Sequence, residues 1–84
     1  MEKTIKEILH SKNSLFGISW SKNKYAEHYF YIRKNESAIE VIYNKEKDIE
    51  KKTFNIKNEK IEEDLFNYIN NNFNIPNDFL VTYF

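Results

Sequence analysis

The segment that decides the fold runs from Lys24 to Tyr43 and reads KYAEHYFYIRKNESAIEVIY. It contains two runs in which apolar and polar side chains alternate, separated by a polar break at Asn35-Glu36. Alternation with a period of two is typical of strands that bury one face. The segment therefore predicts a β-hairpin, and the remaining elements are expected to pack around it.

The two faces of this hairpin differ in composition, because successive side chains of a strand point to opposite sides. The face predicted to be buried carries Ala26, His28, Phe30, Ile32, Ile39, Val41 and Tyr43. A two-residue loop at Asn35-Glu36 would place Ile32 opposite Ile39, and a four-residue loop closing on the same register is an alternative. A slip of one residue would put apolar side chains on the polar face, so one register is expected.

The opposite face is rich in tyrosine and is predicted to bind a partner. The residues of this predicted site are Tyr25, Glu27, Tyr29, Tyr31, Arg33, Glu40 and Ile42. Tyrosine and arginine are enriched at the centres of protein interfaces, because they combine rigid contact area with a polar group. The charged residues of the set would form a rim. Two interpretations stay open: the tyrosines form a binding surface, or another segment covers them as a second small core.

Further periodic patterns predict the remaining elements. These are a helix at about residues 4–12, strands at 15–20, 51–57 and 79–84, and a helix at about 59–72. Thr4 and Glu7 have the spacing of a capping box, and Asn58 is a typical N-cap residue. Ile49 fits neither neighbouring element and is expected at a bulge.

The predicted order is α-β-β-β-β-α-β in a single α+β domain spanning residues 1–84. We expect a two-layer sandwich: a mainly antiparallel five-stranded sheet with two helices on one face. If strands 51–57 and 79–84 were parallel neighbours, the second helix would be their right-handed crossover. Strand 79–84 is apolar at nearly every position, which favours a central or doubly covered place.

Composition excludes several kinds of chemistry. The 84 residues include no cysteine and one glycine, Gly17, so thiolate sites and glycine-rich phosphate loops are ruled out. His10 and His28 form no metal-binding motif with other residues. We therefore expect a protein that is not an enzyme and has no cofactor and no metal. The charged N-terminal residues and the lack of a long apolar run predict a cytoplasmic protein without a membrane segment.

These observations favour a small protein-binding module that occupies the surface of a partner protein. One concrete form is an inhibitor or an immunity or anti-defence protein of a phage or mobile element, since abundant Lys, Asn and Ile are typical of AT-rich coding. The alternative is a single-stranded nucleic-acid-binding domain that uses sheet aromatics and nearby lysines. Thirteen basic and thirteen acidic residues balance to zero, which argues against a general polyanion binder.

The sequence leaves the choice between monomer and homodimer open. Strand 15–20, LFGISW, has no charge or proline to protect it if it lies at a sheet edge. Strand 51–57 carries lysines that would protect an edge. Any homodimer is therefore expected to use strand 15–20 or the tyrosine-rich face, and not strand 51–57.

Overall fold

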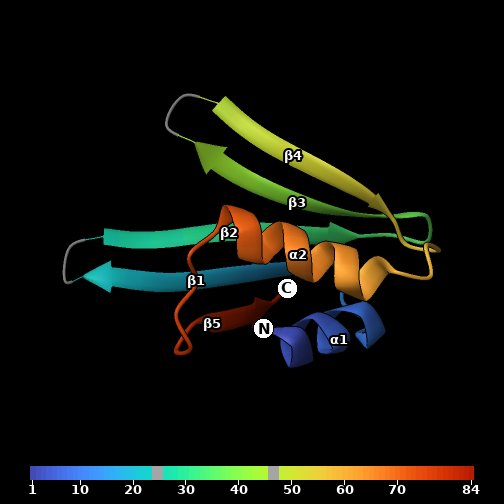
Figure 1. Cartoon of the computed structure of the whole chain (residues 1–84), viewed down its shortest axis with the longest axis horizontal. Helices are drawn as coiled ribbons and strands as arrows, with labels where there is room; N and C mark the ends of the chain where they lie inside the picture. Colours follow the sequence, from blue (N-terminus) through green and yellow to red (C-terminus); the bar gives the residue numbers. More distant parts are fainter. Residues whose placement is uncertain (24–25, 46–47) are drawn as a thin grey trace.

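The computed structural model describes residues 1–23, 26–45 and 48–84 (Figure 1). These residues form two helices and a five-stranded antiparallel sheet. The elements are α1 (Glu2–His10), β1 (Leu15–Asn23), β2 (Ala26–Lys34), β3 (Ala38–Lys45), β4 (Asp48–Asn55), α2 (Ile61–Asn72) and β5 (Leu80–Tyr83). The predicted element order and the α+β class are confirmed.

The strand order across the sheet is β4-β3-β2-β1-β5. β5 pairs antiparallel with β1, at the opposite edge from β4, so the parallel β4–β5 crossover is wrong. The central position expected for β5 is also wrong: β5 is an edge strand, and β1, considered as an edge, is paired on both sides. The cause is the segment after α2, which brings the chain back beside β1 (Figure 1).

Both helices cover the same face of the sheet, which confirms the two-layer arrangement (Figure 1). The fully or almost fully buried side chains are Ile5, Ile8, Phe16, Ile18, Trp20, Phe30, Ile32, Ile39, Val41, Leu65, Ile69 and Phe73. Strand residues in this set recur at every second position, and helix residues recur three or four positions apart. Burial of this one cluster is what holds the helical layer on the sheet.

The hairpin of β2 and β3 closes in a different register from the predicted one. The pairs are Tyr31–Ile42, Ile32–Val41, Arg33–Glu40 and Lys34–Ile39. The loop has four residues, and the register is shifted by two. The Asn35 side-chain Oδ1 accepts hydrogen bonds of 2.8 Å from the backbone N–H groups of Ser37 and Ala38, and this turn fixes the longer loop. Because the shift is even, the side chains keep their predicted faces.

β1 extends beyond the predicted strand 15–20, and β4 begins before the predicted strand 51–57. The polar residues Ser21 to Asn23 continue β1, and Ile18 lies opposite Phe30. The residues between β1 and β2, at 24–25, lie outside the described part of the chain. β3 and β4 pair without interruption from Ala38–Asn55 to Lys45–Asp48. The bulge expected at Ile49 is therefore absent from this described ladder, where Ile49 lies opposite Asn44.

The helix starts differ from the predicted caps. α1 begins at Glu2, so Thr4 lies inside its first turn, and neither helix shows a side-chain hydrogen bond at its N-cap residue. α2 begins at Ile61, with Lys60 as the N-cap. Asn58 instead stabilises the preceding turn: its Oδ1 accepts the backbone N–H of Lys60 at 3.1 Å, and its Nδ2 donates to Asp64 at 2.8 Å.

One lysine ties the C-terminal end of α1 to the sheet. The Lys34 Nζ donates hydrogen bonds to the backbone carbonyls of Leu9, at 3.1 Å, and Ser11. It also lies 5.8 Å from the centre of the Phe16 ring. Burial lowers the pKa of the Lys34 ammonium. A cation at this position satisfies carbonyl groups that a helix end leaves unpaired and complements the negative end of its dipole.

The open face of the sheet as a candidate protein-binding site

The face of the sheet that points away from the helices is called here the open face. Its residues, assigned by alternation along the paired strands, are Leu15, Gly17, Ser19, Ser21, Glu27, Tyr29, Tyr31, Arg33, Ala38, Glu40, Ile42, Asn44, Ile49, Lys51, Thr53, Asn55, Leu80, Thr82 and Phe84. They form rows that cross the sheet, such as Thr82–Gly17–Tyr31–Ile42–Lys51. Five strands therefore contribute to one surface with a fixed backbone.

Aromatic and aliphatic side chains gather at the centre of the open face. The rings of Tyr29 and Tyr31 meet edge to face, with centroids 5.6 Å apart, and Tyr31 lies 6.3 Å from Phe84. Tyr29 is 43% exposed, Tyr31 36%, Phe84 59% and Leu80 68%. Four large side chains thus remain accessible on a continuous part of the sheet. The described residues leave Tyr29 and Tyr31 open to solvent, so these two rings do not form a second buried core within this part of the chain.

Gly17 allows two of these rings to come together. A Cβ atom at position 17 would lie 3.3 Å from a ring carbon of Phe84 and 3.6 Å from one of Tyr31. Gly17 therefore allows the rings of Phe84 and Tyr31 to approach the backbone closely, as a glycine inside a strand often does. A shallow hollow of about 260 Å³ lies here, lined by Gly17, Ile18, Ser19, Glu27, Tyr29, Tyr31, Thr82 and Phe84. Small residues form its floor, and aromatic rings form its sides.

A charged cluster borders the aromatic centre. The Arg33 guanidinium donates to both carboxylate oxygens of Glu40, at 3.1 and 3.2 Å, and the Lys51 Nζ lies 3.4 Å from the same carboxylate. The Glu40 side chain is only 14% exposed. Partial desolvation raises its pKa, but the hydrogen bonds and positive charges of Arg33 and Lys51 lower it by more, so the pKa lies below its usual value of 4.5. Glu40 thus holds two cations in place at the border of the face.

The structure brings most of the predicted site residues onto one surface. Those are Glu27, Tyr29, Tyr31, Arg33, Glu40 and Ile42. Tyr25 lies outside the described residues. Sequence reasoning missed Leu80 and Phe84, which reach the open face because β5 pairs with β1. Leu80, Thr82 and Phe84 alternate with Phe79, Val81 and Tyr83 along the strand, which would have assigned them to one face. Because nearly all of these residues are apolar, the alternation did not show which face is exposed.

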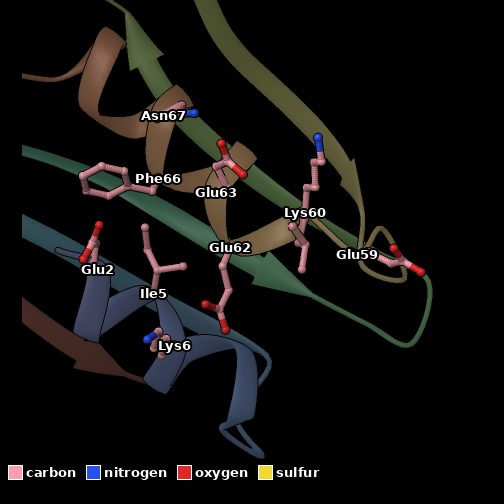
Figure 2. Close-up of a pocket in the computed structure, with 10 residues that line it drawn as sticks. Glu2, Ile5, Lys6, Glu59, Lys60, Glu62, Glu63, Phe66 and Asn67 are labelled. Carbon is pink, nitrogen blue, oxygen red and sulfur yellow. The ribbon is translucent and has the colours of Figure 1, made fainter.

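A second hollow, of about 690 Å³, lies between the two helices (Figure 2). Ile5 and Phe66 line it together with charged side chains of both signs, including Glu2, Lys6 and Glu62. Carboxylates in the first turn of α2 complement the positive end of the helix dipole, which accounts for them without a ligand. Within the described residues, no group of three or more His, Cys, Asp or Glu side chains is placed to hold a metal ion.

No family model matches this sequence, and comparisons with curated proteins and with solved structures find no match either. Among the described residues, neither helix has both the length and the apolar character needed to cross a membrane. What the protein binds must therefore be inferred from its own side chains.

Proposed function

We propose that this chain is a non-enzymatic protein-binding module that acts by occupying a surface of a partner protein through its open face. The observation that carries the proposal is the exposed group of Tyr29, Tyr31, Leu80 and Phe84 around Gly17. Contiguous exposed apolar side chains mark interaction sites on soluble proteins. Because the group lies on paired strands, little ordering is needed when a partner binds.

The shape of the face indicates how a partner would be held. The hollow beside the packed rings of Tyr31 and Phe84, lined also by Ser19 and Glu27, would accept one apolar side chain of the partner, in the manner of an interface anchor. At the border, Arg33 and Lys51 retain donors that the Glu40 carboxylate does not use. These donors would face carboxylates of the partner. The complementary surface therefore has an apolar centre and an acidic border at this side.

The proposal includes a more specific form, in which binding blocks the partner, as an inhibitor or immunity protein of a phage or mobile element does. Small size, a rigid face and AT-rich coding support that form. An inhibitor differs from a scaffold in its effect on the partner, because saturating the partner with this chain would abolish the partner's activity.

The second candidate, single-stranded nucleic-acid binding, rests on the exposed rings of Tyr29 and Tyr31, on which bases could stack. It is less well supported. Both Arg33 and Lys51 lie against Glu40, and Glu27 adds a further negative charge to the face. A fluorescence titration with mixed oligonucleotides at about 50 mM salt separates the two candidates, since the electrostatic contribution is largest at low salt. Saturable binding there would favour the nucleic-acid candidate.

The main experiment is capture of the partner from host lysate, followed by affinity measurement with purified proteins. The test variant combines Tyr29→Ala and Tyr31→Ala. The matched control is Tyr83→Ala, which removes an exposed tyrosine on the helix side of the sheet, beside Phe16. We expect the double variant to lose at least about tenfold in affinity, as loss of interface aromatics typically costs more than 1 kcal/mol. A folded double variant with full affinity would show that the open face is not the binding site.

A further inference from the structure

β5 presents an unprotected edge whose backbone orientation follows from one hydrogen bond. The Phe84 backbone N–H donates to the Leu15 carbonyl at 3.0 Å. In an antiparallel ladder, successive residues point their N–H and C=O groups alternately toward one neighbour and away from it. The backbone groups of Leu80 and Thr82 therefore point toward β1, and those of Val81 and Tyr83 point toward the edge of the sheet.

The two edges of the sheet differ in charge. β4, at one edge, includes Asp48, Glu50, Lys51 and Lys52. β5, at the other edge, has the sequence LVTY and carries no charged side chain and no proline. Charged residues and proline are the usual protection of an edge strand against pairing with another chain. A second chain could thus pair with β5 without desolvating a charge on that strand.

We propose that β5 pairs with β5 of a second copy of this chain, antiparallel and around a two-fold axis at Thr82. Val81 then exchanges both backbone hydrogen bonds with Tyr83 of the second copy, and Thr82 faces its own equivalent. Leu80 lies opposite Phe84 of the second copy. The two sheets become one sheet that runs through both copies.

This register is favoured over the neighbouring symmetric ones for two reasons. An axis at Val81 would pair Val81 with itself and place Leu80 opposite Thr82. An axis at Tyr83 would pair Tyr83 with itself and place Phe84 opposite Thr82. The axis at Thr82 uses the edge groups of Val81 and Tyr83 together. It also places the two most exposed large apolar side chains of this edge, Leu80 and Phe84, against each other. Cross-strand apolar pairs and threonine pairs both stabilise a sheet.

Such a contact is isologous and closes as a dimer, so it does not propagate into a fibre. Because β5 is short, the buried area is expected to lie below the roughly 1,200 Å² of stable interfaces, and the dimer should be weak and concentration-dependent. The inference does not depend on the proposed function. Its consequence for the open face is geometric, since Leu80 and Phe84 of both copies would join the two faces into one.

The chain has no cysteine, so a single introduced thiol reports on this register directly. Thr82→Cys places two thiols opposite each other at a non-hydrogen-bonded pair, about 4.5–5.5 Å apart at Cβ, close enough for a disulfide. Thr53→Cys, on the open face of edge strand β4, is the matched control. Under mild oxidation we expect Thr82→Cys to form a covalent dimer at least about tenfold faster than Thr53→Cys, because pairing raises the local thiol concentration. Equal rates would overturn the proposal.

Sedimentation equilibrium at several concentrations provides the second measurement. The wild type should dimerise in a concentration-dependent manner, and Val81→Pro should abolish this, because proline removes an edge N–H that β1 does not use. Leu80→Lys, at an exposed position, should weaken the dimer without affecting folding. Circular dichroism checks the fold of both variants. A wild type that stays monomeric, or a dimer that a folded Val81→Pro or Leu80→Lys variant retains unchanged, would overturn the proposal.

Discussion

The ring of Phe73 stacks on the ring of Phe30, with the centroids 4.4 Å apart and the planes inclined by 15°. Phe73 follows α2 directly, and its ring also meets Trp20 and Tyr43 edge to face. The paired region of β2 and β3 ends at Tyr31–Ile42, and Figure 1 shows β3 and β4 diverging from β2 beyond it. Phe73 thus packs on the helix side where the two strands separate.

Phe73→Ala is therefore expected to destabilise the protein by about 3–5 kcal/mol, the usual cost of removing a buried phenylalanine. Urea unfolding followed by tryptophan fluorescence measures the loss, since Trp20 is in contact with the ring. Phe84→Ala is the control, because it removes an aromatic ring that is more than half exposed. A similar loss of stability in both variants would contradict the role assigned to Phe73.

Gly17→Ala is expected to weaken partner binding while changing the stability of the fold only slightly. The added methyl lies 3.3 Å from an exposed ring, which can move, and loss of the glycine reduces the entropy of the unfolded chain. The free energy of unfolding should change by less than about 1 kcal/mol. Partner affinity should fall, because the methyl fills the floor of the hollow. Ser37→Ala, at an exposed position of the β2–β3 loop outside the hollow, is the control, and equal affinities of the two variants would show that the hollow is not used.

The pKa of Glu40 gives the protein a specific acid sensitivity. Because the folded state holds this pKa below 4.5, the ionised carboxylate stabilises the fold above that value. This contribution is lost as the pH falls through the lowered pKa. Glu40→Gln should therefore reduce stability near pH 7, and the difference from the wild type should shrink in strongly acidic solution. Urea unfolding at a series of pH values measures it, with the exposed loop variant Glu36→Gln as a control for charge. A difference that is independent of pH would contradict this assignment.

Lys34→Met should loosen α1. The variant keeps the aliphatic part of the side chain but loses the hydrogen bonds to the carbonyls of Leu9 and Ser11. Bonds of this kind contribute about 1.5–3 kcal/mol when buried, and less for a partly exposed group, so we expect a loss of about 1–2 kcal/mol. Hydrogen exchange should accelerate in α1 more than in β2 or β3. Lys12→Met, at an exposed position, is the control, and equal effects would contradict a specific role for Lys34.

The sequence predicts the faces of the strands well, because alternation records burial residue by residue. Ile32, Phe30 and Val41 are buried as expected, although the β2–β3 register differs. The register depended on the side-chain hydrogen bonds of Asn35, which alternation does not encode. The hydrogen bonds of the turn therefore set the β2–β3 register, which periodicity alone does not determine.

The position of β5 could not be predicted from its own residues. A short apolar strand fits a central position or an uncharged edge equally well on pattern alone. Its partner was decided by the path of the chain after α2, together with the partial burial of Val81 beside Ile18 and the ring contact between Phe16 and Tyr83. Leu80 and Phe84 therefore could not be assigned to the open face from the sequence, since they reach it only through the pairing of β5 with β1.

The pairing of β1 with β5 also has a consequence during protein synthesis. β1 emerges early, but the strand that covers its outer side is made only after α2. Until then LFGISW is an uncharged edge on any partly folded sheet, and such edges are where nascent chains associate wrongly. β5 therefore covers the edge of β1 only late in synthesis. Until then, β1 is the strand most exposed to association with neighbouring chains.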